Sequence, residues 1–483
     1  MMKGDRIKII QFSFFVIISI FLLFSCECKE EDNEELPYEK PVWTVLMYSG
    51  ADNDLETVLL LDMSEVKKAF NGTVNILVCI DRSAGYSTST YPFGTDFSGM
   101  KVFSLTRDGF VEMKDAEFIP VLVSDHNSGN ADILKGFIDY GKKKYPDTKY
   151  ALFIGSHGQG SRSSDSSDLV KNENLVQDQT SNDWILTPEF TEKMGSEQSV
   201  DLLAIDACFM GNIEFIYQLR KGNNSFSADY IVASPPEIRS EGWNYTDIFS
   251  RIKIGGNVTN ENNRIVYGQS TLSALDFALI IFEEFYDKVI TQTSRNQVIT
   301  IYDTRYVLDV KNNFDDLSKL LVNHKVDLKS IRGSASILQS EIIHYFNSAN
   351  LSHSIAYPYF DLYDLCDKIQ QNNDEVFSED MVGKALLVMK AIDTFIIDSA
   401  GDADYSPYFK NGKNGVSIFF PEGDLMYENK LLWNEYIWYN VNLAWCKDNA
   451  VAGDASTDNW FELLDCWFDS TTDSTGGLNN YSF

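Results

Sequence analysis

Short apolar runs alternate with amphipathic segments over the first half of the chain. The runs are rich in Val, Ile, Leu and aromatic residues, and they span 42–48, 74–80, 150–155, 201–205 and 230–234. Continuous apolar runs of this length are typical of strands that are buried on both faces. The segments between them carry apolar residues at helical spacing, over 54–70, 130–146, 187–194 and 210–220. The alternation predicts an α/β fold with a mostly parallel β-sheet and helices on both faces.

The rest of the pattern suggests how the chain is organised around this sheet. An Asp-Gly turn between β-prone flanks at 101–113 predicts a hairpin. The polar stretch 160–183 is rich in Ser, Asp and Asn, and connections of that length are usually functional or disordered. We therefore expect a main domain over 42–250 and a helix-rich part over 251–445, in which one late strand at 415–421 returns to the sheet. Residues 446–483 are expected to form a poorly defined tail.

The first 41 residues have a different character. Basic residues precede a fourteen-residue apolar run at 12–25, which suits the core of a signal peptide and is short for a membrane span. Cys26 follows in "LFSC", which resembles the lipobox of bacterial lipoproteins, and residues 26–41 read as an acidic disordered tether. This resemblance implies a protein lipidated at Cys26, on the outer membrane or surface of a Gram-negative bacterium. An ordinary secretory signal followed by a chance cysteine is the alternative.

Composition narrows the classes of partner and cofactor. The formal net charge is −31, which argues against nucleic acid and is compatible either with a basic substrate or with a solvated acidic surface. The chain has seven cysteines without a CxxC pair, and only five histidines. A zinc site or a multi-histidine metal cluster is therefore not expected, and no redox cofactor is implied. A disulfide between Cys446 and Cys466 stays open.

Three polar clusters end predicted strands, and ligands of open α/β sheets gather at that edge. The clusters are Asp52-Asn53-Asp54, Ser156-His157-Gly158 and Asp206-Ala207-Cys208. An imidazole stabilises a neighbouring thiolate, and the start of the helix expected after Cys208 would add positive potential. The amides of Gly158 and Cys208 are candidate donors to an oxyanion. Cys79, which lies within an apolar run, is better explained as core.

Acidic residues near Cys208 are candidates for substrate binding. Asp206 lies two positions earlier, so it would share a face with Cys208 if the strand persists, and it could pair with a guanidinium. The alternative is that Asp206 caps the following helix. Glu237 and Glu241 follow the run 230–234, where they would either line a pocket wall or be solvated loop charges.

The segments "WTVLMYSGADNDLE", "SHGQG", "LLAIDACFMGNIE" and "ASPPEIRSEGWNY" together resemble the clostripain family of cysteine peptidases, relatives of caspases and gingipains. The likeness extends over residues 42–445. It implies a caspase-like fold, a dyad of His157 and Cys208, an acidic specificity position at Asp206, and cleavage of proteins after Arg or Lys. His157 precedes Cys208 by 208 − 157 = 51 residues, close to the spacing of about 50 in caspases. Calcium stimulation and self-cleavage are also implied, although no EF-hand spacing is present.

Two other functions remain open at this point. Asp52-x-Asp54 resembles an aspartyl nucleophile with magnesium, although the simpler interpretation makes Asn53 or Asp54 the N-cap of helix 54–70. A non-enzymatic surface lipoprotein that binds protein or glycan is the other alternative.

Self-cleavage would fall in the polar stretch 160–183, whose basic residues are Arg162 and Lys171. Lys171 lies 171 − 157 = 14 positions after His157 and could reach the cleft, whereas Arg162 is too close to it to enter in an extended form. A surface loop that is never processed is the alternative.

Overall fold

The structure is a computed structural model, and its elements lie in the compact unit Pro41–Phe483, which is separate from the unit Met1–Lys40. It describes residues 40–118, 126–160, 175–222, 224–239, 242–292, 295–325, 327–328, 341–347, 349–372, 376–405, 408–421, 442–451 and 456–468. The predicted signal peptide, Cys26, Arg162, Lys171 and Glu241 therefore lie outside the described residues.

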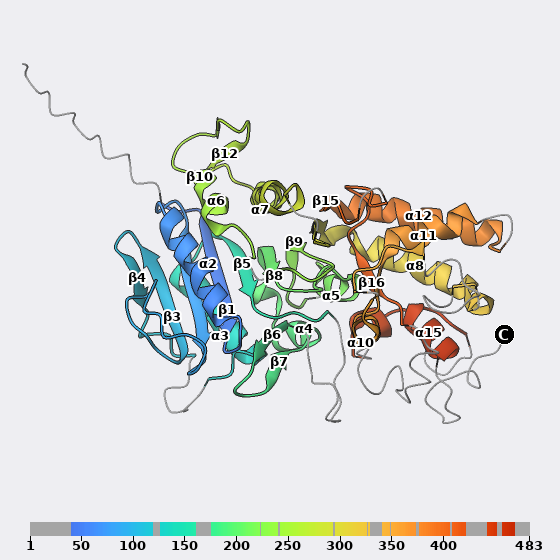
Figure 1. Cartoon of the computed structure of the whole chain (residues 1–483), viewed down its shortest axis with the longest axis horizontal. Coiled ribbons are helices and arrows are strands. Elements are labelled where there is room, and N and C mark those ends of the chain that lie inside the picture. Colours follow the sequence, from blue (N-terminus) through green and yellow to red (C-terminus); the bar gives the residue numbers. More distant parts are fainter. Residues whose placement is uncertain are drawn as a thin grey trace, which may run out of the picture. The chain divides into compact units, whose positions relative to one another are not determined.

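The central sheet has nine strands among the described residues, in the order β15-β13-β9-β8-β5-β1-β2-β3-β4 (Figure 1). Their bounds are β1 Trp43–Ala51, β2 Asn75–Arg82, β3 Gly99–Thr106, β4 Gly109–Glu112, β5 Lys149–Gly155, β8 Val200–Asp206, β9 Ala228–Ala233, β13 Val298–Asp303 and β15 Ile396–Gly401. The five strands expected from the apolar runs form the parallel centre β2-β1-β5-β8-β9. The predicted hairpin is also confirmed, because β3 pairs with β2 and with β4 in antiparallel fashion.

Side chains alternate between the two faces of this sheet, and each face carries its own core. On one face Val45 and Met47 pack with α2 (Glu56–Ala69), α6 (Tyr245–Ser250) and α7 (Ala274–Phe285). On the other face Leu46 and Tyr48 belong to the core shared with α3 (Ala131–Lys144), α4 (Glu189–Lys193), α5 (Ile213–Gln218) and α8 (Val307–Leu320). Strands buried on both faces explain why their sequences are continuous apolar runs.

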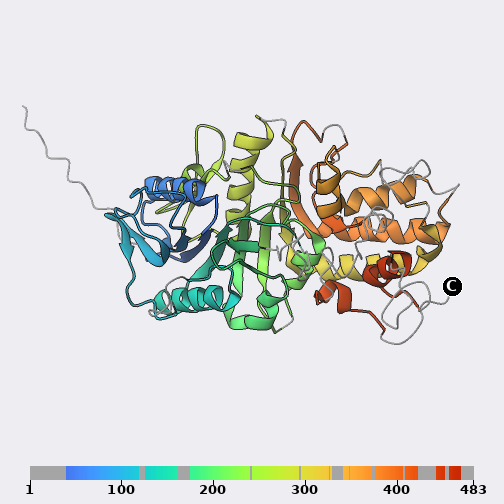
Figure 2. The same ribbon diagram turned by 60° about the horizontal axis from the view of Figure 1, so that its bottom comes forward.

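The second half of the chain contributes both strands and helices. β13 and β15 extend the sheet beyond β9 in antiparallel fashion, so the sheet crosses the boundary expected at residue 250. α11 (Leu362–Gln371) and α12 (Glu379–Phe395) pack side by side near α8 (Figures 1 and 2). The expectation that the strand at 415–421 returns to the sheet is wrong. β16 (Ser417–Phe419) pairs instead with β14 (Tyr359–Asp361) in a separate sheet, because the chain leaves β15 through a loop that carries β16 past Gly211.

Smaller elements complete the fold. Two further small sheets are formed by β6 (Leu175–Asp178) with β7 (Asp183–Ile185), and by β10 (Ile252–Lys253), β12 (Ile265–Gly268) and β11 (Val258–Thr259). The remaining helical elements are η1 (Ser196–Gln198), η2 (Tyr286–Ile290), η3 (Thr304–Tyr306), η4 (Val322–His324), α10 (Leu351–Ala356), α14 (Ala444–Lys447) and α15 (Trp460–Phe468). None of the helices in the described part of the chain combines the length and apolar character that a membrane span needs.

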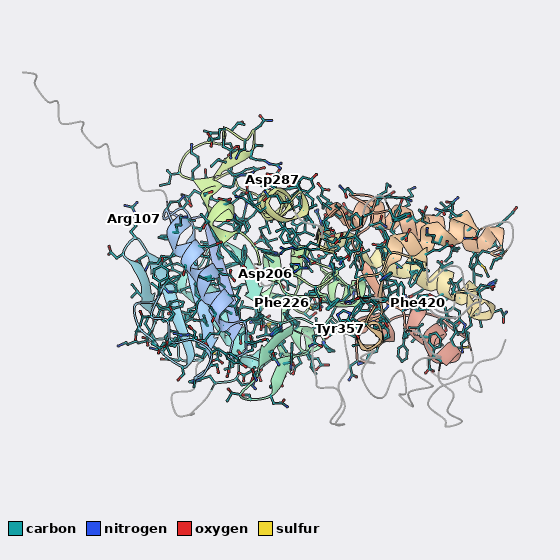
Figure 3. The ribbon with its side chains drawn as sticks, viewed as in Figure 1. Arg107, Asp206, Phe226, Asp287, Tyr357 and Phe420 are labelled. Atoms are coloured by element: carbon teal, nitrogen blue, oxygen red, sulfur yellow. The ribbon has the colours of Figure 1, made fainter. Side chains whose placement is uncertain are left out.

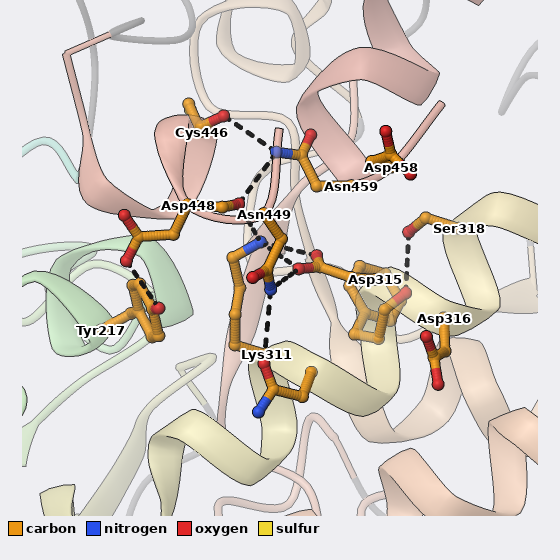
Figure 4. A network of polar contacts seen from close by, with 12 residues as sticks. Tyr217, Lys311, Asp315, Asp316, Ser318, Cys446, Asp448, Asn449, Asp458 and Asn459 are labelled. Carbon is orange, nitrogen blue, oxygen red and sulfur yellow. Dashed lines mark hydrogen bonds and ion pairs between the residues drawn. The ribbon is translucent and has the colours of Figure 1, made fainter. Parts of the chain in front are cut away.

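A buried polar cluster joins α8 to the segment expected to be a tail (Figure 4). Lys311 Nζ donates to Asp315 Oδ1 at 2.6 Å and to the Asp448 carbonyl at 3.2 Å, while Asn449 Nδ2 donates to Asp315 Oδ2 at 2.7 Å. In the same segment, Trp460 of α15 is buried and bonds through Nε1 to the Phe419 carbonyl at 2.9 Å. Cys446 and Cys466 are both buried free thiols rather than a disulfide.

Candidate active site

His157 and Cys208 line the same cavity at the carboxyl edge of the sheet. His157 follows β5 and Cys208 follows β8, and these strands are parallel neighbours with Gly155 in register with Asp206. The cavity measures about 1250 Å³, and its wall also includes Glu237, Ile238, Arg239, Gln297, His344 and His353. The sheet therefore brings together the predicted histidine and cysteine.

Gly158 lets the two strand ends approach closely. A Cβ atom built on Gly158 would lie 2.5 Å from the Cys208 carbonyl oxygen and 3.0 Å from the Cys208 nitrogen. Any larger residue would push the backbone that carries Cys208 away from the backbone that carries His157. Glycine at position 158 thus has a packing reason that is independent of any role for its amide.

The Cys208 thiol packs partly buried against the core and has acidic neighbours. Its Sγ donates to the Ile238 carbonyl at 3.5 Å. The pKa of the Cys208 thiol is raised to about 12, mainly by burial and also by the Glu237 and Asp206 carboxylates, against the opposing effect of the Ile238 hydrogen bond. The thiol is therefore protonated at rest and needs a base, or a nearby cation, to ionise.

The helix after Cys208 begins later than the sequence suggested. Phe209 has φ of +59°, and the Phe209 and Gly211 amides donate to the carbonyls of Pro236 and Ser234. This turn delays α5, whose first residue is Ile213, by 213 − 208 = 5 positions. The helix expected over 210–220 therefore begins 213 − 210 = 3 residues later than predicted, because the turn first ties the chain to the segment after β9.

His157 pairs with an acidic side chain from a different strand end. Its Nε2 lies 2.7 Å from Asp54 Oδ1, with exposed side-chain fractions of 31% for His157 and 69% for Asp54. The Trp184 ring of β7 lies beside the imidazole at 6.4 Å between centroids. Asp54 is thus the partner of His157. The expectation that Asn53 or Asp54 caps the helix is wrong, because α2 begins at Glu56 with Leu55 as its N-cap, and Asn53 Oδ1 accepts instead from Leu55 N at 3.0 Å.

Asp206 does not share a face with Cys208, so that prediction is wrong. β8 ends at Asp206, and the alternation that would have carried Cys208 to the same side stops there. Asp206, which is labelled in Figure 3, accepts at Oδ2 from Trp243 N at 3.1 Å and from Tyr245 Oη at 3.2 Å. Trp243 and Tyr245 belong to the core on the α2 side. Burial raises the pKa of the Asp206 carboxyl to about 6. Asp206 is not among the described residues that line the cavity.

Glu237 lines the cavity and is held there by residues that the sequence analysis did not single out. His353 Nδ1 accepts from Asn347 N at 3.0 Å, so Nε2 carries the proton and donates to Glu237 Oε1 at 3.1 Å. Gln297 Nε2 donates to the Glu237 carbonyl at 2.9 Å. The His353 hydrogen bond lowers the pKa of Glu237, which is therefore charged at neutral pH. The scarcity of histidine in the chain was the one sequence signal that could have drawn attention to His353.

The described residues offer no fit for a metal ion. No group of three or more His, Cys, Asp or Glu side chains in that part of the chain is placed to hold one. The calcium stimulation implied by the resemblance thus has no site among these residues, and no step below uses calcium.

Comparison with known proteins supports one family. A sequence model of the clostripain family (peptidase C11) matches residues 47–467. Clostripain from Hathewaya histolytica is 34% identical over 91% of this chain and 89% of that protein.

Solved structures agree on the fold. An inactive zymogen C11 protease from Parabacteroides distasonis has a TM-score of 0.53 at 19% identity, covering 86% of this chain and 99% of that one. A secreted C11 cysteine protease from Bacteroides thetaiotaomicron, in complex with an irreversible peptide inhibitor, has a TM-score of 0.51 at 18% identity, covering 84% and 98%. These likenesses confirm the predicted caspase-like α/β fold. Together with the family match over most of its length, they place this chain in the clostripain family, as a cysteine-type endopeptidase.

Proposed function

We propose that this endopeptidase cleaves proteins after Arg or Lys, with Cys208 as nucleophile and His157 as proton carrier. The observation that carries the proposal is that His157, Cys208 and a charged Glu237 line one cavity. In the structure Cys208 Sγ donates to the Ile238 carbonyl and His157 pairs with Asp54. Before the reaction, the thiol therefore has to exchange the Ile238 carbonyl for the imidazole as its hydrogen-bond partner. Contacts of this kind often tighten only when substrate binds.

The reaction follows from the chemistry of these groups. The imidazole takes the proton from Sγ, and the thiolate attacks the scissile carbonyl carbon to give a tetrahedral oxyanion. The C–N bond then breaks, and the imidazolium gives its proton to the leaving amine. Water attacks the resulting thioester while the imidazole accepts a proton, which releases the carboxyl product and restores the thiol. The amides of Gly158 and Cys208 are the proposed oxyanion donors, and the close approach of these two backbones supports the pairing.

Negative charge around the thiol supports a basic residue at the cleaved bond. Both Glu237 and Asp206 raise the pKa of Cys208, so the fields of both carboxylates reach the sulfur. The substrate side chain next to the scissile carbonyl sits beside that sulfur, where an Arg or Lys cation offsets the two charges. Glu237 has the stronger case because it lines the cavity. Asp206 does not line the cavity and would act on the site only through its charge.

Peptide reporters that differ only in the residue before the cleaved bond test this proposal. Wild type should cut Arg and Lys reporters and leave an Asp reporter intact. Cys208→Ala and His157→Ala should each lose turnover by several orders of magnitude, as when other nucleophiles or bases are deleted. Labelling with iodoacetamide and mapping the modified cysteine supplies the control, because buried Cys79 and Cys366 should stay unmodified. Equal cleavage of all reporters contradicts the specificity, and turnover by Cys208→Ala contradicts the nucleophile.

No observation favours the two alternative functions. Asp54 of the phosphatase-like pair is engaged by His157, and Asp52 is buried. The family match favours a peptidase over a binding protein without activity.

Self-processing is the second part of the proposal. The segment 161–174, with Arg162 and Lys171, follows Gly160 in the sequence and precedes β6. Gly158 and Leu175, which flank the segment, form a bridge, and Gly158 follows His157 of the cavity wall. A chain that leaves and returns at the site is a tethered substrate for an enzyme that cuts after Lys, and Lys171 is the preferred position.

Export with a lipid anchor is the third part. One similar structure is that of a secreted C11 protease, and the apolar run before Cys26 supports export here. More than one acyl chain at Cys26 would hold the protein stably on a membrane. Cys26→Ser should release it into soluble fractions, and equal retention of wild type and variant would contradict the anchor. The strong negative charge argues against nucleic acid as a partner.

A further inference from the structure

We propose that Asp54 is a positioning residue for His157. Its carboxylate accepts the proton on Nε2, so that Nδ1 becomes the ring nitrogen that exchanges a proton with the Cys208 thiol. The proposal rests on the roles proposed above for His157 and Cys208. Asp54 itself touches the imidazole and not the reacting atoms, so its effect passes through His157.

The contact joins parts of the chain that only the fold brings together. Asp54 and His157 are 103 positions apart, and 2.7 Å separates Oδ1 from Nε2. Asp54 follows β1 and His157 follows β5, which are parallel neighbours in the sheet. Nδ1 of His157 has no hydrogen-bond partner among the described residues. One ring nitrogen is thus engaged, and the other is left for the thiol that lines the same cavity.

The turn that carries Asp54 is fixed by the buried residue before it. Asn53 is fully buried, and its Nδ2 donates to the Gly50 carbonyl at 2.9 Å and to the Gln177 carbonyl at 3.0 Å. Its Oδ1 accepts from Leu55 N at 3.0 Å. These bonds lock the backbone on both sides of Asp54, so the carboxylate is presented in one direction although its side chain is largely exposed.

The small sheet of β6 and β7, to which Gln177 belongs, also fixes the backbone of His157. Val176 N of β6 donates to the His157 carbonyl at 3.2 Å, and the next residue of β6, Gln177, holds Asn53. Two adjacent residues of one strand therefore set the relative position of the base and of its carboxylate. An exposed ion pair on flexible side chains contributes little to stability, about 0–1 kcal/mol, and would not need such a frame. The frame points to a role in orientation.

The chemical reason for such a partner lies in the protonated thiol. Transfer of its proton creates an imidazolium in which both ring nitrogens are donors, and a carboxylate at Nε2 stabilises that state more than the neutral ring. The cavity that His157 lines carries further charged or titratable groups, namely Cys208, Glu237, Arg239, Arg295, Glu341, His344, Tyr345, His353, Lys368, Asp404, Tyr405 and Tyr408, and the Trp184 ring lies beside the imidazole. Among the described residues, Asp54 is the one whose side chain is bonded to the imidazole.

Kinetics of Asp54 variants of the full chain provide the first test. Asp54→Ala and Asp54→Asn should lower kcat on an Arg reporter by roughly 10- to 100-fold with little change in KM, a smaller loss than the about 10⁴-fold of a buried triad aspartate because Asp54 is exposed. Asp54→Glu should recover part of the activity. Asp132→Asn is the matched control, since Asp132 is similarly exposed at 61% and forms an ion pair with Lys193 away from the cavity. A kcat within twofold of wild type for Asp54→Ala would overturn the proposal.

The pH dependence of thiol alkylation separates positioning from a structural role. Iodoacetamide should label Cys208 more slowly in Asp54→Ala than in wild type, and the ratio should be larger at pH 6.5 than at pH 9. At the lower pH the thiolate exists mainly as an ion pair with the imidazolium, which Asp54 supports, whereas free thiolate adds a route at the higher pH. A ratio that does not change with pH would count against the proposal.

Nitrogen NMR of the five histidines tests the contact without any turnover. In wild type labelled with ¹⁵N-histidine, the neutral His157 ring should carry its proton on Nε2, and His157→Ala identifies its signals. Asp54→Ala should change this to a mixture of tautomers, and Asp54→Glu should restore it. An unchanged Nε2–H tautomer in Asp54→Ala overturns the inference even in an active enzyme. The expected change supports it even if the chain cleaves none of the Arg or Lys reporters.

Discussion

At the scale of single residues, the site sets carboxylates next to a thiol that has to ionise. Glu237 raises the pKa of Cys208 and at the same time offers a partner for a basic substrate residue. These two effects oppose each other in the free enzyme, because the charge that attracts the substrate also disfavours the thiolate. A bound Arg or Lys side chain would remove the conflict by neutralising the carboxylate. Substrate binding and activation of the nucleophile are thereby coupled.

Glu237→Gln separates these two effects. Loss of the charge lowers the pKa of Cys208, so alkylation of the free enzyme at pH 8 should become about 2- to 10-fold faster, while cleavage of Arg reporters falls. Both rates are measured on the same preparation. Glu341→Gln is the control, because Glu341 lines the same cavity but is not among the main charges that raise the pKa of Cys208. A parallel fall of alkylation and cleavage would contradict the coupling.

The buried Asp206 carboxyl leads to a second prediction, about how the free energy of unfolding depends on pH. Its carboxyl pKa is raised by burial to about 6, so its favourable contribution is complete below the unfolded value of about 3.9 and is lost as the pH rises through 6. In Asp206→Asn this loss is absent. The variant should therefore gain about 2 kcal/mol in free energy of unfolding, relative to wild type, between pH 4.5 and pH 7.5.

Urea unfolding at both pH values measures this difference. Asp108→Asn, in the exposed turn between β3 and β4, serves as the control. A relative stability of Asp206→Asn that is the same at both pH values would show that Asp206 is not buried in its charged form. If the variant also loses selectivity for Arg, then Asp206 trades stability for substrate recognition.

At the scale of elements, the buried pair on α8 fixes how the end of the chain packs. Lys311 is fully buried and Asp315 is 2% exposed, and the pair also bonds to the backbone and side chain of residues 448–449. Lys311→Met would leave Asp315 without its cation and should lower the free energy of unfolding by about 3–5 kcal/mol. Lys311→Met with Asp315→Leu should recover most of this loss, since an apolar pair of similar size is tolerated.

A nearby lysine on the same helix gives the comparison for this prediction. Lys319 is 45% exposed and lies 3.8 Å from both Asp316 and Asp458. Lys319→Met should change stability by at most about 1 kcal/mol, as for other exposed pairs. Urea denaturation of the variants decides the matter. Similar losses for the two single variants would mean that burial of Lys311 is not what makes it important.

The elements also show which parts of the fold can be predicted from the sequence. The parallel strands could be found because burial on both faces leaves a continuous apolar run, as in β8. β15 was missed because α12 passes directly into it at Ile396, so that no polar break separates the helical pattern from the strand. The strand at 415–421 was recognised but assigned to the wrong sheet, since an apolar run does not encode its pairing partner.

The same limit applies to the site. His157 and Cys208 could be predicted to meet because both end parallel strands, and parallel strands end at one edge. Asp54 lies at that edge too, but its pairing with His157 depends on the exact turn that Asn53 fixes through Gln177 of β6. The orientation of Asp206 depended on whether β8 continued past it, which the turn at Phe209 decides. Local turns of this kind are set by contacts with distant residues.

At the scale of the whole molecule, the central sheet contains strands from both sides of the proposed processing segment in the sequence. β1, β2 and β5 precede residues 161–174, whereas β8, β9, β13 and β15 follow them. β5, which precedes the segment, pairs with β8, which follows it. Val176 of β6 donates to the His157 carbonyl, and Gln179, just after β6, donates to the Asp52 carbonyl. The two pieces left by a cut after Lys171 share one core, so they should remain together without a covalent link.

Gel analysis and gel filtration test this prediction together. Active wild type should give two bands under denaturing conditions and one peak under native conditions, whereas Cys208→Ala should give a single band. The double variant Lys171→Ala/Arg162→Ala should also remain one chain and be less active. Fully active wild type that stays a single chain would rule out self-processing in this segment. Separation of the two pieces under native conditions would contradict the shared core.

The bridge between Gly158 and Leu175 makes the segment between them replaceable. The residues that flank the segment are held together by this bridge. Residues 161–174 can therefore be exchanged for a foreign recognition sequence of similar length. The entropy of closing the loop would change little, because it varies only with the logarithm of the loop length. A segment that another protease recognises would place activation of this enzyme under that protease, so that one cut by the first protease leads to many cuts by the second. Circular permutants with new termini in the same segment would have the segment open from the start and need no cut.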